Sequence, residues 1–224
     1  MLLQFFLLIL LLLIIFFISK SLINQIYSII QKVFRNQKIA VWILAILFLP
    51  GTVIHELSHL IMALFLRVPT GPMSIFPEFN NESNKSIEVR TGHIMIAKTD
   101  PLRLTIIGVA PMIIGLTLIY FLTDYFWKGW YFVIYLLFIT STTMFSSRQD
   151  LKSLLLTLPV TILIVTALFM SGVKISIEGN ILGITEKILT NLNRGLILTA
   201  GIDYLVLFIL ACLGWLASLR LTAI

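Results

Sequence analysis

Long apolar runs separated by short polar stretches dominate this chain. A helix needs about 20 mostly apolar residues to cross a bilayer. Six runs fit that length approximately: Leu2–Ile18, Ile39–Leu66, Leu102–Thr123, Trp130–Phe145, Leu151–Met170 and Leu196–Leu219. We therefore expect an all-α polytopic membrane protein with about six transmembrane helices. Residues 1–224 would form a single membrane domain.

The first run and the segment after it each allow two interpretations. The first run has no basic residue before its apolar core and no small-residue cleavage site after it, so we favour a retained helix over a signal peptide. In Lys20–Lys38, apolar residues recur at helical spacing among four basic ones. This pattern fits an amphipathic helix at the membrane interface, and it fits equally an extension of a neighbouring span.

The second run and the polar stretch that follows it interrupt the helical pattern. Pro50-Gly51 lies near the middle of Ile39–Leu66 and predicts a kink or a break there. The stretch Arg67–Pro101 is rich in proline, glycine and asparagine, and β-branched residues gather in its second half, Lys85–Thr99. We expect one or two strands there, in a small β-rich segment at the membrane face, because lipid does not tolerate an open strand edge.

The composition excludes several classes of protein. Apolar residues make up 59% of the chain and charged residues only 12%, which is unlike a soluble enzyme or a disordered segment. The net charge of +6 comes from Lys and Arg placed mainly between apolar runs, as in membrane loops, so it does not indicate nucleic-acid binding. The single cysteine, Cys212, cannot form an internal disulfide. We expect a multi-pass integral protein of the cell membrane.

The candidate chemistry lies inside the second apolar run, where residues 55–59 read His55-Glu56-Leu57-Ser58-His59. This is an H-E-x-x-H motif, and positions i and i+4 of a helix share a face, so both imidazoles can bind one ion. Zinc lowers the pKa of a bound water to about 7, and Glu56 could accept that water's proton. Ionisable residues within a span are functional by default, although a structural polar cluster is the alternative.

A catalytic zinc usually has a third protein ligand. His93 lies in the polar stretch and is more simply a surface residue, which leaves Asp150 and Asp203 as the main candidates. If successive spans alternate in direction, Asp150 reaches the side of the membrane where the second run ends, whereas Asp203 enters from the other side. We therefore favour Asp150, although an aspartate before Leu151 could simply be a helix N-cap.

Hydroxyl residues gather toward the end of the fourth run, at Thr140-Ser141-Thr142-Thr143 and at Ser146-Ser147. Such hydroxyls can donate to carbonyls of their own helix at little cost. Their position just before Asp150 also fits a path for the water that hydrolysis needs. The sequence leaves both interpretations open.

These features resemble the site-2 protease family of intramembrane zinc metalloproteases. The residues that carry the resemblance are the motif His55–His59 in a span, a β-rich stretch at 67–101, Gly108-Val109-Ala110-Pro111 in the next span, and a span that ends at Asp150. The similar part covers about Ile39–Lys152 and implies a three-span catalytic core. The resemblance implies one zinc ion bound by His55, His59 and Asp150, with Glu56 as the general base.

The resemblance also implies how a substrate would bind. The stretch around Ile87–Ala97 would hold an unwound segment by strand addition, through the alternate residues Ile87, Val89, Thr91, His93 and Met95. A helix hides its scissile carbonyl in hydrogen bonds, so a transmembrane segment must unwind locally before water can attack it. The expected function is a zinc metalloendopeptidase that hydrolyses peptide bonds in or near transmembrane segments, with a membrane protein and the lipid bilayer as its partners.

Two rival functions use the same residues. A non-catalytic relative could bind membrane partners, with zinc structural or absent, although an intact Glu56 favours catalysis because a purely structural site needs no base. A metal carrier or channel would need further charged residues across the membrane, and only Asp203 offers one. We rank the carrier or channel last.

Overall fold

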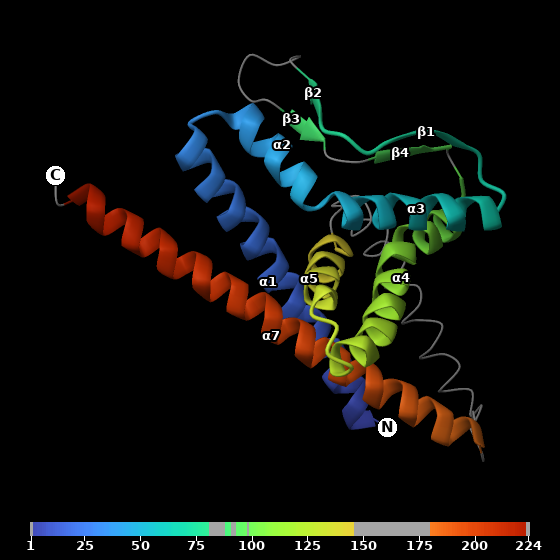
Figure 1. Ribbon diagram of the computed structural model, residues 1–224. Coiled ribbons are helices and arrows are strands. Elements are labelled where there is room, and N and C mark those ends of the chain that lie inside the picture. The colour runs from blue at the N-terminus through green and yellow to red at the C-terminus, as the bar shows by residue number, and fades with distance from the viewer. Residues whose placement is uncertain (1, 81–87, 91–92, 98, 146–179, 223–224) are drawn as a thin grey trace.

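The computed structural model describes residues 2–80, 88–90, 93–97, 99–145 and 180–222, and this part of the chain is mainly helical (Figure 1). The elements in chain order are α1 (Leu2–Phe34), α2 (Gln37–Leu47), α3 (Leu49–Phe65), β1 (Thr70–Ser74), β2 (Glu78–Asn80), β3 (Glu88–Arg90), β4 (His93–Ile96), α4 (Pro101–Trp127), α5 (Phe132–Thr143) and α7 (Asn180–Thr222).

Three helical stretches are long and apolar enough to cross a membrane, namely Leu3–Phe34, Pro101–Trp127 and Leu182–Gly214. The bent pair α2 and α3 would make a fourth span if it counts as one. The expected count of six is therefore not supported. The fourth apolar run forms only the 12-residue α5, about 18 Å long against a hydrocarbon core of roughly 30 Å. The fifth run, Leu151–Met170, lies outside the described residues.

The segment Lys20–Lys38 continues the first span through most of its length. Helix α1 runs without a break to Phe34, so the extension, and not a separate interfacial helix, is what forms. Arg35 has a φ of 51°, which ends the helix. The Asn36 side chain then accepts hydrogen bonds from the backbone amides of Lys38 and Ile39 and caps α2.

The second apolar run breaks at Phe48, as Pro50 predicted. Helices α2 and α3 meet there at an angle of 71°. Pro50 lies in the first turn of α3, where a missing backbone N–H costs little. The Tyr135 hydroxyl of α5 donates to the Leu47 carbonyl at 3.1 Å, so a neighbouring helix satisfies a carbonyl at the break.

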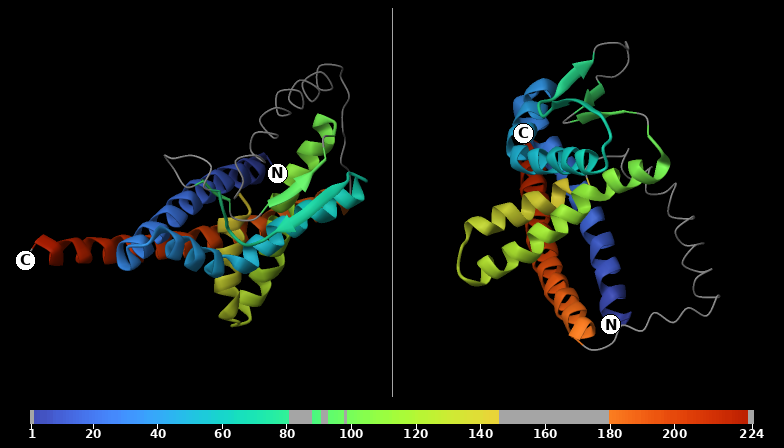
Figure 2. Two further views of the ribbon diagram at one scale, coloured as in Figure 1. Left: turned by 90° about the horizontal axis from the view of Figure 1, so that it is seen from above. Right: turned by 90° about the vertical axis from the view of Figure 1, so that its right-hand side faces the viewer.

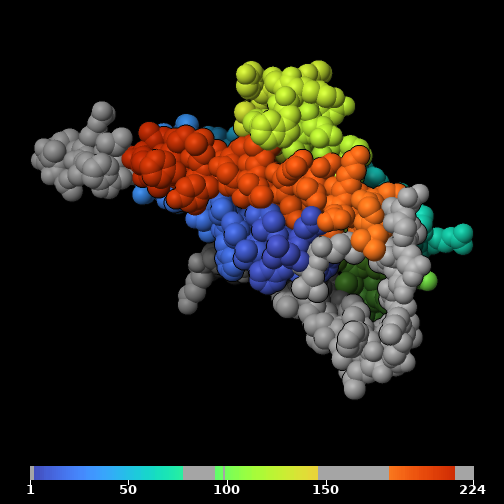
Figure 3. Space-filling view, turned by 90° about the horizontal axis from the view of Figure 1, so that it is seen from below, coloured from blue at the N-terminus to red at the C-terminus, as the bar shows by residue number. Residues whose placement is uncertain are grey.

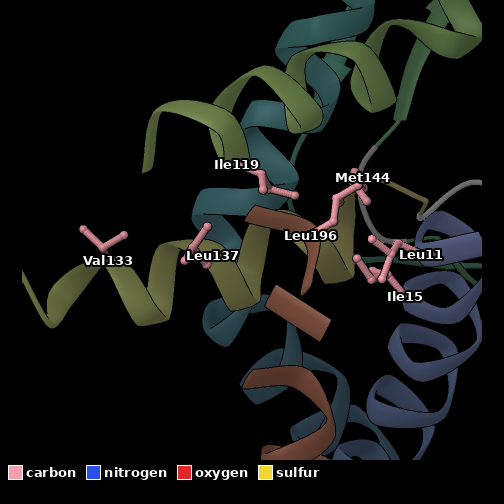
Figure 4. Packing of buried hydrophobic residues seen from close by; sticks show 7 residues of the cluster. All are labelled: Leu11, Ile15, Ile119, Val133, Leu137, Met144 and Leu196. Atoms are coloured by element: carbon pink, nitrogen blue, oxygen red, sulfur yellow. The ribbon is translucent and has the colours of Figure 1, made fainter. Parts of the chain in front are cut away.

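Helices α1 and α7 pack side by side and run in the same direction (Figures 2 and 3). At one end of the pair, the Gln4 side chain donates to the Thr190 hydroxyl at 2.9 Å, and Asn193 donates back to the Gln4 carbonyl at 2.9 Å. Apolar side chains from α1, α4, α5 and α7 form a core beside this pair (Figure 4), namely Leu11, Ile15, Ile119, Val133, Leu137, Met144 and Leu196.

Only 17% of the most apolar window of α7 is buried inside the protein. The exposed remainder is rich in large apolar side chains, as expected for a surface that faces lipid, and its members include Tyr204, Leu205, Phe208, Ile209 and Leu213.

The polar stretch after α3 forms two small antiparallel sheets, of which one lies along α3. Strand β1 pairs with β4, with Thr70 opposite Ile96 and Ser74 opposite His93, and β2 pairs with β3. Strands β1 and β4 lie along α3, as Figure 1 shows. The strands expected in Lys85–Thr99 are thus β3 and β4. Their partners β1 and β2 come from the first half of the polar stretch, where the sequence pattern predicted no strand.

Helix α4 begins at an N-cap and ends at a tight turn. The Asp100 carboxylate accepts a hydrogen bond from the Arg103 backbone amide at 3.2 Å, which holds the pKa of Asp100 below its usual value. Pro101 follows at the first helical position. After α4, Gly129 adopts a φ of 83° that favours glycine, and the chain turns back into α5.

Candidate metal centre on helix α3

Helix α3 carries the H-E-x-x-H motif and packs closely against α5. A Cβ atom added at Gly51 would overlap the side chains of Ile139 and Thr143 on α5. Gly51 therefore allows the two helices to approach at the turn that precedes His55. The break at Phe48 and the missing side chain at Gly51 together set how α3 lies in the bundle.

His55 and His59 lie one helical turn apart with their rings close together. Both residues are buried, with exposed fractions of 5% and 6%. Their Nε2 atoms are 3.2 Å apart, and the two rings are nearly perpendicular at an interplanar angle of 84°. Two imidazole nitrogens bound to one tetrahedral zinc at about 2.0–2.1 Å stand roughly 3.3 Å apart. The spacing of the pair therefore fits two ligands of a single zinc ion.

The other ring nitrogen of His59 has a backbone partner on α4. His59 Nδ1 lies 2.8 Å from the carbonyl oxygen of Ile107. A carbonyl oxygen only accepts, so Nδ1 carries the hydrogen and Nε2 presents its lone pair. A metal-binding histidine usually donates its second ring N–H in this way, and the partner fixes both tautomer and ring orientation.

Proline explains why the Ile107 carbonyl is available. In an α-helix the carbonyl of residue 107 would accept from the backbone N–H of residue 111. Residue 111 is Pro111, inside α4, and proline has no N–H to donate. Helix α4 therefore leaves an acceptor at Ile107, and His59 uses it. The buried cluster of Ala63, Val68 and Ile107 holds this part of α4 against the end of α3.

Pro111 entered the sequence analysis only as part of the family resemblance, and Ile107 had no expected role. A signal was present, because a proline inside an apolar helix always leaves the carbonyl four residues earlier without its helical donor. Which side chain would use that carbonyl depends on how α3 and α4 pack, and the sequence alone does not give this.

Glu56 is buried next to the histidine pair along the helix, with an exposed fraction of 6%. Neighbouring positions on an α-helix differ in direction by about 100°, so Glu56 lies beside the face that carries the two imidazoles. If the histidine pair bound a metal, a general base for a water on that metal would lie at such a position. Burial of all three motif residues is costly unless they have partners.

The expected third ligand, Asp150, lies outside the described residues. Within the described part of the chain, no group of three His, Cys, Asp or Glu side chains could hold a metal ion. Asp203 is described, and it does not join the histidine pair. It is fully buried in α7, and Asp150 as the third ligand stays a prediction.

The residues expected to bind substrate fall on two strands. Val89 lies in β3, whereas His93 and Met95 lie in β4. Ile87 and Thr91 lie outside the described residues. Strand β4 pairs with β1 and contacts α3, and Met95 is 60% exposed. Of the expected residues, those on β4 are thus in the strand that lies along the motif helix.

The hydroxyl residues of α5 donate to carbonyls of their own helix. Ser141 donates to the Phe138 carbonyl at 2.8 Å, and Thr143 donates to the Ile139 carbonyl at 2.8 Å. Thr142 donates to the Phe138 carbonyl at 2.7 Å. All three are buried. These three hydroxyls therefore follow the simpler of the two interpretations, which is hydrogen bonding to the backbone of their own helix.

The chain was compared with protein-family models, with curated proteins and with solved structures. No family model, curated protein or solved structure matches it.

Proposed function

We propose that this protein is an intramembrane zinc metalloendopeptidase that cleaves peptide bonds in or near transmembrane segments of other membrane proteins. The observation that carries the proposal is the 3.2 Å separation of the His55 and His59 Nε2 atoms on a helix that also buries Glu56. The separation suits tetrahedral zinc, and Glu56 stands at the position of the motif that supplies the general base for hydrolysis.

The chain's own residues divide the chemistry between them. His55 and His59 would hold the zinc ion, and Asp150 would supply the third ligand. Zinc, when bound, acts as a Lewis acid that polarises the scissile carbonyl. Glu56 accepts a proton from the attacking water as the new C–O bond forms, and it passes that proton to the leaving nitrogen as the C–N bond breaks. The Ile107 carbonyl keeps His59 in the tautomer that this arrangement needs.

The substrate would reach the site as an extended segment. Strand β4 lies along α3 and pairs with β1, so an unwound segment could add to this small sheet above the motif helix. Residues Val89, His93 and Met95, with Ile87 and Thr91, would contact its side chains. The three long apolar helices support a location in a membrane, and we assign the protein to the cell membrane.

The test is the substitution Glu56→Gln in the full-length chain, reconstituted in vesicles with a single-span reporter protein whose transmembrane helix contains glycine and proline. General bases typically contribute 10²–10⁴-fold. We expect cleavage to fall by at least about 100-fold while the zinc content per chain stays that of wild type. Glu186→Gln makes the same chemical change at an exposed position of α7 and should cleave normally. Cleavage that survives Glu56→Gln would reject Glu56 as the base.

A second candidate function is a non-catalytic relative that binds membrane partners. The observation that favours it is that two imidazole nitrogens 3.2 Å apart can also hydrogen-bond to each other without any metal. Metal analysis separates the two functions. Purified protein that takes up no zinc would favour the non-catalytic protein, whereas one zinc per chain, lost when both histidines are replaced, would favour the peptidase.

A further inference from the structure

Asp203 is a carboxylic acid in the interior of the helix bundle, remote in sequence from the histidine motif. It lies in α7, and its exposed fraction is 0%. Its neighbours along α7, Ile202 and Val206, pack against an apolar cluster built from α1, α5 and Phe48. Burying an ionised carboxylate in such surroundings is expensive unless a positive charge or hydrogen-bond donors compensate for the water it loses.

In the part of the chain that the structure describes, hydrogen-bond donors do not compensate for the water that Asp203 loses. Neither carboxyl oxygen of Asp203 accepts a hydrogen bond from the residues that the structure describes. The Ser141 side chain of α5 faces the carboxyl, but its hydroxyl donates to the Phe138 carbonyl at 2.8 Å. The Ser19 hydroxyl of α1 donates to the Ser141 carbonyl at 3.3 Å. One turn before Asp203, Thr199 donates to the Gly195 carbonyl at 2.7 Å.

The consequence is that the nearby hydroxyl groups spend their hydrogens on backbone carbonyls and not on the Asp203 carboxyl. Ser19, Ser141, Thr199 and Asp203 are all almost completely buried. Each serine or threonine hydrogen is used on a backbone carbonyl, so lone pairs remain for any group placed beside the carboxyl. An environment made only of oxygen acceptors attracts a small hard cation.

In the described part of the chain, no charged side chain from a neighbouring helix neutralises the Asp203 carboxylate. On α1 the charged residue next to Ser19 is Lys20, which is exposed. On α4 the candidates are Tyr120 and Asp124, the second of which is exposed, and on α5 Tyr135 donates its hydroxyl to Leu47. No salt bridge reaches Asp203 among the described residues.

The site is distinct from the histidine pair. Ile139 and Thr143 mark the face of α5 that meets α3 at Gly51. Ser141 is two positions from each of them, which on an α-helix places it about 160° away, on the opposite face. Helix α5 therefore separates the two sites, with the motif on one side and Asp203 on the other.

We propose that Asp203, together with Ser141, forms a second cation-binding site of this protein, and that it takes a small hard monovalent cation, either a proton or a sodium ion. The bound cation neutralises the carboxylate and joins α5 and α7, while Ser19 ties α1 to α5 at the same residue, Ser141. This site does not depend on whether the chain is a peptidase, because none of its residues belongs to the histidine motif.

The test uses the purified full-length protein and two measurements. The first is the Tm at fixed pH and ionic strength as sodium chloride replaces choline chloride. The second is the infrared carbonyl-stretching band of a protonated carboxylic acid. Both are repeated in Asp203→Asn, which keeps the shape and removes the charge, and in Asp124→Asn, the same change at an exposed position.

Each outcome decides the proposal. A Tm that rises roughly 3–5 °C for each tenfold increase in saturating sodium, in wild type and Asp124→Asn but not in Asp203→Asn, assigns a sodium ion. An acid band that disappears only in Asp203→Asn, without a sodium response, assigns a proton. If neither response depends on Asp203, the carboxylate carries no cation and the proposal is overturned.

If Asp203→Asn does not fold, Ser141→Ala gives the same decision. Removing this oxygen should reduce the sodium response or shift the acid band, because the hydroxyl would be one of the atoms beside the cation. Unchanged behaviour of Ser141→Ala on both measurements would contradict the site as assigned.

Discussion

Helix α5 separates two buried polar sites that are built in opposite ways. On one side, the His59 ring on α3 donates to the Ile107 carbonyl that Pro111 leaves without a helical donor. On the other side, the hydroxyl hydrogens of Ser19 and Ser141 are already used on backbone carbonyls, and Asp203 receives none of them. A helix bundle can thus bury a donor where its backbone offers a spare acceptor, whereas a buried carboxylate that receives no hydrogen bonds needs an added positive charge.

The largest expected effect is on zinc binding, which should depend on the histidine pair and not on Asp203. Replacing His55 and His59 together by alanine removes both nitrogens of the pair, and we expect complete loss of bound zinc. The variant Asp203→Asn lies across α5 and should keep wild-type zinc. Zinc per chain, measured by elemental analysis of the purified proteins, tests this contrast. Equal zinc loss in both variants would mean that the two sites are one.

The next effect tests the spare acceptor itself. In Pro111→Ala the backbone N–H of residue 111 returns and competes with His59 for the Ile107 carbonyl. Removing the outer partner of a metal-bound histidine typically costs 10–100-fold in affinity, so we expect zinc affinity to fall by about that factor. Competition with a zinc chelator measures it.

A matched proline provides the control for this experiment. Pro101→Ala changes a proline at the first position of α4, where the restored N–H meets no helical carbonyl. We expect unchanged zinc affinity there. A fall of equal size in both variants would point to general loosening of α4 and away from the Ile107 carbonyl.

A smaller effect concerns the packing that keeps the two sites apart. Gly51→Ala places a Cβ atom where Ile139 and Thr143 of α5 already lie. Overpacking typically costs about 1–3 kcal/mol, so we expect a lower Tm. Gly201→Ala, where an added Cβ meets nothing within 4 Å, should keep or slightly raise the Tm. A Tm for Gly51→Ala equal to that of Gly201→Ala would contradict close contact between α3 and α5.

The smallest expected effect concerns Asp100, a carboxylate that, unlike Asp203, accepts a hydrogen bond from a backbone amide. Asp100 caps α4, and its pKa is lowered from 3.8 mainly by the Arg103 backbone amide. A lowered pKa means that the stabilisation is present above the unfolded-state pKa and is lost as the pH falls through the lower folded value. We expect Asp100→Ala to lower the Tm slightly at neutral pH and to match wild type in strong acid.

Asp100→Asn serves as its control, because asparagine caps helices about as well and carries no charge. The difference between this variant and Asp100→Ala should not depend on pH. Thermal unfolding followed at several pH values provides the measurement. A deficit for Asp100→Ala that persists unchanged in acid would show that the carboxylate's charge does not contribute.

The sequence predicted the features that depend on local chemistry. Pro50 predicted the break between α2 and α3, and the β-branched residues of Lys85–Thr99 predicted strands β3 and β4. The i, i+4 spacing of His55 and His59 predicted that their rings could meet. In each of these, the structural consequence follows from residues close together in the chain, so no tertiary information was needed.

The features that depend on packing between distant segments were not predictable. The described residues do not support six spans, because α5 is short and the run containing Pro50 is bent. Strand β1, which contains Gly71 and Pro72, has a composition that argues against a strand, and it forms by pairing with β4. The link from Pro111 through Ile107 to His59 required knowing that α3 and α4 lie together.

The parallel pairing of α1 with α7 has a consequence for biogenesis in the membrane. The hydrogen bond from Gln4 to Thr190 joins residues 186 positions apart, and α7 covers the side of α1 that carries Leu11 and Ile15. During synthesis, α1 leaves the ribosome long before the helix that completes its packing. Until α7 follows it into the bilayer, α1 must remain with the insertion machinery or with lipid alone, so the bundle closes only after α7 has been synthesised.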